Sequence, residues 1–157
     1  MVQNRKARAY GLMSLFWEYQ IFAFSAETGS ASGSRSRAVA QVLCNVAEFL
    51  SGKPSDVEET LLFISHIIRK CAHMAEFAVL AVLVFMLIKS LKNKKMPYSA
   101  LFTTVFSAAA DEFHQMFVPG RGSAVSDVMI DSCGAAIGII VLMLIQKKST
   151  GGYHFEI

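Results

Sequence analysis

Long apolar runs are the feature that most restricts what this chain can fold into. Hydrophobic residues make up 54% of the 157 residues and charged residues only 17%, and the mean hydropathy is +0.43. The runs approach the roughly 20 residues that a helix needs to cross the ~30 Å hydrocarbon layer of a bilayer. We therefore expect an integral membrane protein with a single domain over residues 1–157.

Four segments are expected to cross the membrane: residues 10–24, 71–90, 97–114 and 127–146. Basic residues precede the first segment, as they do in a signal peptide. However, Glu18 interrupts its apolar run, and the later segments need a first crossing to set their orientation. The predicted fold class is all-α, an integral membrane four-helix bundle.

The connection between the first two crossings carries further predictions. Residues 25–36 are rich in serine and glycine and are expected to form a loop. Residues 37–50 have apolar side chains at helical spacing, which predicts a short extracytoplasmic amphipathic helix. Gly52 and Pro54 should end it. A second outer helix, from Asp56, should continue directly into the second crossing because no glycine or proline intervenes.

The basic residues indicate topology. They lie before the first crossing, between the second and third, and after the fourth: Arg5, Lys6, Arg8, Lys89, Lys92, Lys94, Lys95, Lys147 and Lys148. Because basic loops stay inside, both termini are expected in the cytoplasm and the loops around residues 25–68 and 115–126 outside. Because the basic residues behind the net charge of +3 are explained by topology, we expect no nucleic-acid partner. A turn from Pro119 to Gly122 should join the last two crossings in an outer hairpin.

Ionisable and amide side chains gather at the predicted outer ends of three helices. They are Arg69, Lys70, His73, Glu76, Asp111, Glu112, Gln115, Arg121, Asp127 and Asp131. One interpretation is that these groups neutralise one another so that the helix ends can lie in the headgroup region. The other is a partly desolvated functional site.

The residue types allow two kinds of chemistry at such a site. Acid and base roles would fall to His73, Glu76, Asp111, Glu112, Asp127 and Asp131. An anionic headgroup would be held by Arg69, Lys70, Gln115 and Arg121. The only cofactor that the sequence suggests is a divalent metal, with His73, Glu76, Glu112 and Asp127 as candidate ligands.

Small residues mark one face of the last predicted helix. Gly134 and Gly138 lie four positions apart, with Ala135 beside them. Such a face lets two helices pack closely, so we expect a structural role for these residues.

Three of these stretches together resemble the VanZ-like family: Arg69 to Phe77, Asp111 to Arg121, and Asp127 to Asp131 followed by Gly134 and Gly138. The exit from the first helix at Phe24 and Ser25 is similar too, although Ala26 and Glu27 depart from the Ser-Gln of the family's pattern. The resemblance covers residues 17–145.

The resemblance implies a small multi-pass protein of a bacterial cytoplasmic membrane, linked to low-level teicoplanin resistance. Its expected partners are membrane lipids or a lipid-linked envelope precursor, which the outer polar site would bind or act on. A non-catalytic scaffolding protein that alters the access of glycopeptides to the envelope is the alternative. The serine motif Gly-x-Ser-x-Gly of hydrolases is absent, which disfavours a nucleophilic serine. Neither the ligand nor the oligomeric state follows from the sequence.

Overall fold

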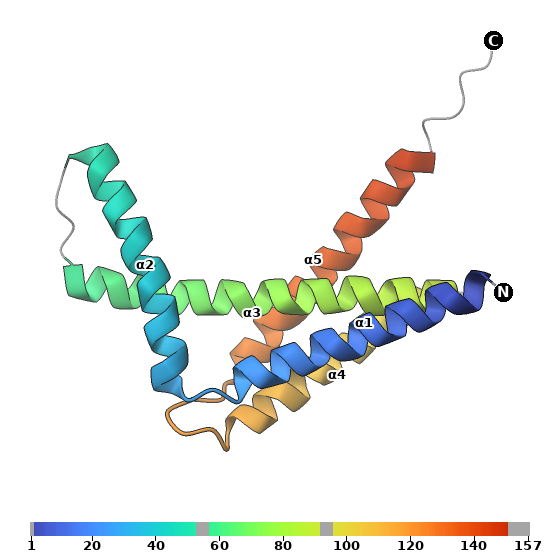
Figure 1. Cartoon of the computed structure of the whole chain (residues 1–157), viewed down its shortest axis with the longest axis horizontal. Helices are drawn as coiled ribbons and strands as arrows, with labels where there is room; N and C mark the ends of the chain where they lie inside the picture. Colours follow the sequence, from blue (N-terminus) through green and yellow to red (C-terminus); the bar gives the residue numbers. More distant parts are fainter. Residues whose placement is uncertain (1, 53–56, 92–95, 151–157) are drawn as a thin grey trace, which may run out of the picture.

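The computed structural model describes residues 2–52, 57–91 and 96–150, and these residues form five helices and no strand (Figure 1). The helices are α1 (Val2–Ser25), α2 (Gly29–Ser51), α3 (Val57–Ser90), α4 (Met96–Gln115) and α5 (Val125–Thr150). The predicted all-α fold class is confirmed. Each predicted crossing lies within one helix: α1, α3, α4 and α5 in chain order.

Helix α3 organises the fold. Its 34 residues make it about 50 Å long at 1.5 Å per residue, and each of the other four helices packs against it. In Figure 1, α1 and α4 lie alongside the C-terminal half of α3, whereas α5 and α2 cross it. The prediction that the second outer helix continues into the second crossing is confirmed by α3, although Pro54 and Asp56 lie outside the described residues.

The apolar core has two parts. The larger part joins α1, α3, α4 and α5 through the buried side chains of Ile21, Phe77, Leu80, Val84, Phe85 and Ile139 and several alanines. The smaller part joins α2 to the N-terminal third of α3 through Ala40, Cys44 and Leu61. Helix α2 therefore packs on α3 at a distance from the main core.

The small-residue face of α5 brings its backbone against α3. A Cβ atom added at Gly134 would lie 2.2 Å from the carbonyl oxygen of Met74, and one at Gly138 would lie 2.5 Å from that of Ala78. No side chain fits at either distance. The predicted close packing of the fourth segment is confirmed.

The prediction of a loop over residues 25–36 is wrong. Only residues 26–28 link α1 to α2, because Thr28 caps the new helix and accepts a hydrogen bond from the backbone N–H of Ala31. The hydroxyls of Ser34 and Ser36 donate to backbone carbonyls one turn earlier, so they are satisfied within the helix. The predicted helix of residues 37–50 is the remainder of α2, and Gly52 ends it with φ of 65°.

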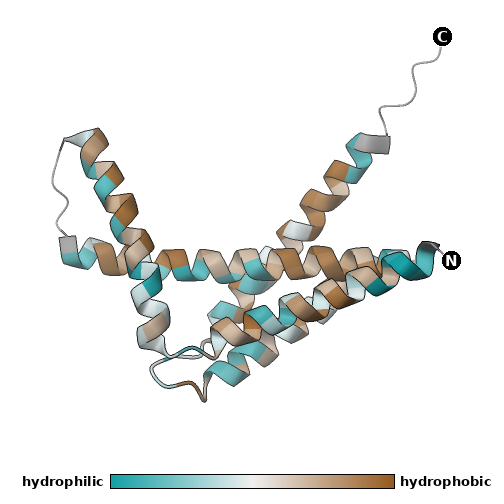
Figure 2. Ribbon diagram, in the orientation of Figure 1, coloured by the Kyte–Doolittle hydropathy of each residue, from teal (hydrophilic) through white to brown (hydrophobic). Residues whose placement is uncertain are grey.

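Two helical segments are long and apolar enough to cross a membrane, Glu58–Ser90 and Val125–Lys148. Only 28% and 22% of their most apolar windows is buried within the protein, and Figure 2 shows how hydrophobic residues dominate α5 and much of α3. The predicted crossings at residues 10–24 and 97–114 do not meet the same criterion and stay predictions. Both carry exposed apolar side chains, among them Leu15, Phe16, Phe102 and Phe106.

Candidate functional site

A buried carboxylate, Asp111, joins the ends of α1 and α4. Its Oδ2 atom accepts a hydrogen bond from the Ser25 hydroxyl at 2.7 Å and another from the Gln115 amide at 2.8 Å. Asp111 is 2% exposed and Ser25 is fully buried. The other oxygen of Asp111, Oδ1, is buried and has no hydrogen-bond partner within the described residues. This atom is a buried acceptor that the described hydrogen bonds leave unused.

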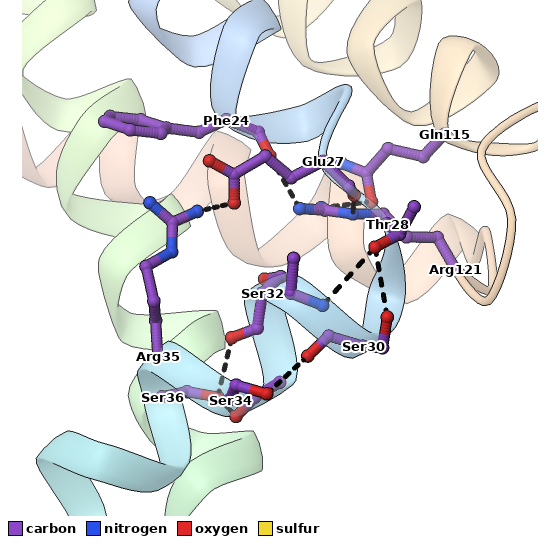
Figure 3. A network of polar contacts seen from close by, with 12 residues as sticks. Phe24, Glu27, Thr28, Ser30, Ser32, Ser34, Arg35, Ser36, Gln115 and Arg121 are labelled. Atoms are coloured by element: carbon purple, nitrogen blue, oxygen red, sulfur yellow. Dashed lines mark hydrogen bonds and ion pairs between the residues drawn. The ribbon is translucent and has the colours of Figure 1, made fainter.

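Arg121 holds the connection between α1 and α2 in place (Figure 3). Its guanidinium donates to the carbonyl of Phe24 at 2.7 Å, to the carbonyl of Glu27 at 2.9 Å and to Oε1 of Gln115 at 3.1 Å. The two backbone carbonyls lie at or beyond the end of α1, where carbonyls have no partner within the helix. Arg121 is therefore largely committed to contacts within the protein.

Two glycines allow the hairpin between α4 and α5 to approach α2. The backbone N–H of Gly29 donates to the carbonyl of Pro119 at 3.0 Å, and a Cβ at Gly29 would lie 1.8 Å from the Gly120 oxygen. Gly120 has φ of 73°, which an L side chain rarely adopts. This contact places Arg121 beside the start of α2.

Glu112 of α4 and Asp127 of α5 both have partners within the protein near the start of α5. Glu112 accepts a hydrogen bond from the backbone N–H of Ala124 at 2.7 Å, next to the first residue of α5. Asp127 forms an ion pair with Lys70, and each side chain is 30% exposed. These contacts tie α4 and α3 to the same end of α5.

His73 and Glu76 lie one turn apart on α3. The His73 Nδ1 atom is 3.8 Å from a carboxylate oxygen of Glu76, too long for a hydrogen bond, and it has no hydrogen-bond partner among the described residues. The indole N–H of Trp17 donates to the backbone carbonyl of Glu76 at 2.9 Å, which fixes α1 against this turn of α3. His73 thus keeps a nitrogen available beside a carboxylate.

A first cavity of about 220 Å³ brings most of the predicted site residues together. Its lining includes three cations, Arg69, Lys70 and Arg121, two histidines, His66 and His73, and the amide of Gln115. Three carboxylates complete it, Glu112, Asp127 and Asp131. Glu76 lines a second cavity of similar volume, and the two cavities share Arg69, His73 and Arg121. Asp111 lines neither cavity.

The carboxylates and histidines do not converge as metal ligands. No three His, Cys, Asp or Glu side chains within residues 2–52, 57–91 and 96–150 are arranged so that they could hold a metal ion. The candidate ligands His73, Glu76, Glu112 and Asp127 are divided between the two cavities. The arrangement therefore offers charged binding groups and acid–base groups rather than a metal centre.

Arg121 lies beside a second arginine, Arg69, at the junction of the two cavities. Burial, followed by the positive charge of Arg69, lowers the pKa of the Arg121 guanidinium, and the carboxylates of Asp111 and Glu112 act in the opposite direction. The positive charges are thus held close together at an electrostatic cost.

Reasoning from the sequence missed two contributors to the site. The sequence places Ser25 only at the exit from the first helix and gives it no partner, yet its hydroxyl donates a hydrogen bond to Asp111. Trp17 is of the residue type that often anchors a helix at the membrane interface, yet its indole N–H donates a hydrogen bond to the backbone carbonyl of Glu76. Neither partnership leaves a signal in the sequence, because the partners are 86 and 59 positions apart.

Comparison with known proteins gave one match. The VanZ/LLP1 family model matches residues 10–146, which is most of the chain. No curated protein and no solved structure matched.

Proposed function

The chain belongs to the VanZ/LLP1 family, and we propose that it is a multi-pass bacterial membrane protein whose polar cavities face outward and bind a lipid-linked or other cell-envelope molecule. Through this binding it lowers susceptibility to teicoplanin. The observation that carries the proposal is the first cavity, in which α3, α4, α5 and the outer hairpin bring three cations and three carboxylates together.

The exposed apolar surface supports a membrane location. The apolar windows of α3 and α5 are mostly unburied, so water would meet a large hydrophobic area if the protein were not in a bilayer. Lipid removes this cost because its acyl chains are as apolar as the side chains.

The positions of the basic residues support the orientation. The start of α1, the end of α3 and the end of α5 lie toward the same side of the molecule (Figure 1), and each carries basic residues, including Arg5, Lys89 and Lys148. Lys92, Lys94 and Lys95 lie outside the described residues. The positive-inside rule places this side in the cytoplasm, so the cavities at the other ends of α1 and α4 face outward.

Asp131 provides the sharpest test. It is 5% exposed, lines the first cavity and makes no hydrogen bond or ion pair within the described residues, so Asp131→Asn removes the acid without breaking an internal contact. We expect this variant to insert normally and to lose most of the resistance to teicoplanin, measured as the inhibitory concentration in a sensitive host. Glu59→Gln removes an exposed acid from α3 and should leave resistance unchanged.

Equal resistance in wild type and Asp131→Asn, at equal protein levels, would overturn the proposal. Glu112→Gln adds a second check, because the amide oxygen of glutamine can still accept the hydrogen bond of Ala124. Loss of resistance in this variant at normal stability separates a functional charge from a purely structural contact.

Acid–base catalysis is a second candidate, favoured by His73, which lines both cavities and has a buried Nδ1 without a partner within the described residues. Catalysis requires that membranes containing the protein convert a labelled lipid-linked envelope precursor into a new species. Mass spectrometry of extracts from wild type and His73→Gln distinguishes the two functions. Unchanged precursor in both favours binding alone.

A further inference from the structure

The second cavity has a positive inner wall. Three arginines line it, Arg35, Arg69 and Arg121, against one acidic residue, Glu76. The lining of the first cavity is balanced by contrast, with three carboxylates beside its three cations. An anion is thus better matched to the second cavity than to the first.

Arg69 is the arginine of this wall that has no internal partner in the part of the chain that the structure describes. Arg35 forms an ion pair with Glu27 and lies over the ring of Phe24, 5.2 Å from its centre. Arg121 is committed to carbonyls and to Gln115. The Nε atom of Arg69 is buried and makes no hydrogen bond there. A buried N–H donor without an acceptor is costly, so this side of the guanidinium is prepared for an anion from outside the chain.

The surroundings of Arg69 leave room for such an anion. Its Nη2 atom lies beside Gly33 of α2. Because glycine has no side chain, the space next to Nη2 stays open, whereas an added Cβ would lie 3.4 Å from it. Ser32, one residue earlier, also lines the cavity, and its hydroxyl makes no hydrogen bond within the described residues. A guanidinium and a hydroxyl together provide several donors, which is what phosphate oxygens require.

The lining of the second cavity also includes apolar side chains that are open to the surroundings. Phe24 and Val39 are 39% and 50% exposed, and Ala72 is exposed as well. Beyond Val39, the surface of α2 continues with the exposed apolar side chains of Val42, Leu43 and Val46. A molecule held at Arg69 can therefore place an acyl chain along α2.

We propose that the second cavity binds the phosphate headgroup of an anionic lipid, with Arg69 receiving the phosphate and the apolar side chains of α2 contacting the acyl chain. The proposal deepens the proposed function and rests on its membrane location. Guanidinium favours phosphate because its parallel N–H groups match two phosphate oxygens. The lowered pKa of Arg121 is consistent with two neighbouring positive charges that an anion would stabilise.

Binding of soluble probes to the detergent-purified full chain tests the proposal. The probes are dihexanoyl phosphatidic acid, dihexanoyl phosphatidylcholine and inorganic phosphate, titrated by calorimetry. We expect saturable binding of phosphatidic acid, and weaker binding of phosphatidylcholine, whose positive choline opposes the arginines. Arg69→Gln should weaken the binding of phosphatidic acid about tenfold or more, as expected for lost hydrogen bonds between charged groups.

Arg37→Gln is the matched control. It removes the same charge from the exposed surface of α2, where Arg37 pairs with Glu58 at 2.5 Å, and should change the affinity less than about twofold. An equal loss of affinity in Arg37→Gln and Arg69→Gln would indicate unspecific attraction and overturn the assignment of the site. The absence of saturable binding of phosphatidic acid to wild type would overturn it as well.

Val39→Ser separates a lipid from free phosphate and protects the test against a misfolded Arg69 variant. Val39 is half exposed, so its replacement should not disturb the fold. We expect it to weaken the binding of phosphatidic acid but not that of inorganic phosphate. Inorganic phosphate bound as tightly as phosphatidic acid, with no effect of Val39→Ser, would overturn the lipid assignment. The resistance assay with Asp131→Asn is a separate readout, so either proposal can fail alone.

Discussion

The hydroxyl of Ser25 donates a hydrogen bond of 2.7 Å to Oδ2 of Asp111, and this contact links residues 86 positions apart at the ends of α1 and α4. Both side chains are almost completely buried. The pair is the innermost part of the polar network, from which Gln115 and Arg121 extend to the surface. The site is thus supported by a buried hydrogen bond between its first and third predicted crossings.

Ser25→Ala tests this support. The substitution leaves Oδ2 of Asp111 with a single donor and should lower the free energy of unfolding by about 1–3 kcal/mol, the usual cost of losing a partner of a buried charged group. Ser34→Ala is the control, since its exposed hydroxyl bonds only to its own helix, and should change stability by less than about 0.5 kcal/mol. Denaturation in mixed micelles measures both, and equal stabilities would contradict the role of Ser25.

Gly134→Ala tests the contact between α5 and α3. Its new Cβ would lie 2.2 Å from the backbone oxygen of Met74, so one helix must move away from the other. Overpacking of this kind costs about 1–3 kcal/mol. Gly122→Ala is the matched control, because no atom lies within 4 Å of its added Cβ. A melting temperature that falls equally in both variants would argue against close helix packing.

The helices were predictable where one local signal sufficed. Apolar runs predicted α1, α4 and α5, and the lack of glycine or proline before Lys89 predicted that α3 would be continuous. The serine-rich start of α2 was mispredicted because composition does not show that a hydroxyl will bond to its own helix. Thr28 caps the start of α2, but as a sequence signal for a helix start it is equally weak, because the stretch around it contains many hydroxyl residues.

The polar site was predictable as a gathering of residues but not as a set of contacts. The helix ends alone indicated only that cations and carboxylates would neutralise one another, and the ion pair of Lys70 with Asp127 is one such contact. They did not indicate that Arg121 would be occupied by backbone carbonyls while Arg69 stayed without a partner in the described residues. This division depends on where the hairpin lies against α2, which the contact between Gly29 and Gly120 determines.

Arg121→Lys tests whether Arg121 acts as a clamp. Lysine keeps the charge but cannot reach Phe24, Glu27 and Gln115 at the same time, so we expect a loss of about 1–3 kcal/mol in stability. Hydrogen exchange of the amides in residues 26–32 should become faster. Arg35→Lys is the control, because a lysine can keep the single ion pair with Glu27. Unchanged exchange in Arg121→Lys would show that the carbonyl contacts are dispensable.

A double-mutant cycle on Lys70 and Asp127 tests the value of a half-buried ion pair. With Lys70→Met and Asp127→Asn we expect a coupling energy of about 0.5–2 kcal/mol, because each side chain is only 30% exposed. The same cycle on Arg37 and Glu58, whose side chains are 45% and 66% exposed, should give a smaller coupling within the range of surface pairs. Couplings in the opposite order would mean that the site derives no extra stability from Lys70.

Labelling of single cysteines tests the proposed orientation of the site in the membrane. In a variant without native cysteines, Gly122→Cys places one thiol in the exposed hairpin beside the first cavity, and Ala9→Cys places one at the basic start of α1. A membrane-impermeant maleimide should label residue 122 in intact cells, and residue 9 only after the membrane is permeabilised. This expectation follows from the positive-inside rule, by which the basic residues Arg5, Lys6 and Arg8 favour a cytoplasmic N-terminus. The reverse pattern would place the cavity inside the cell and exclude a direct role at the outer envelope, even if every stability prediction above were met.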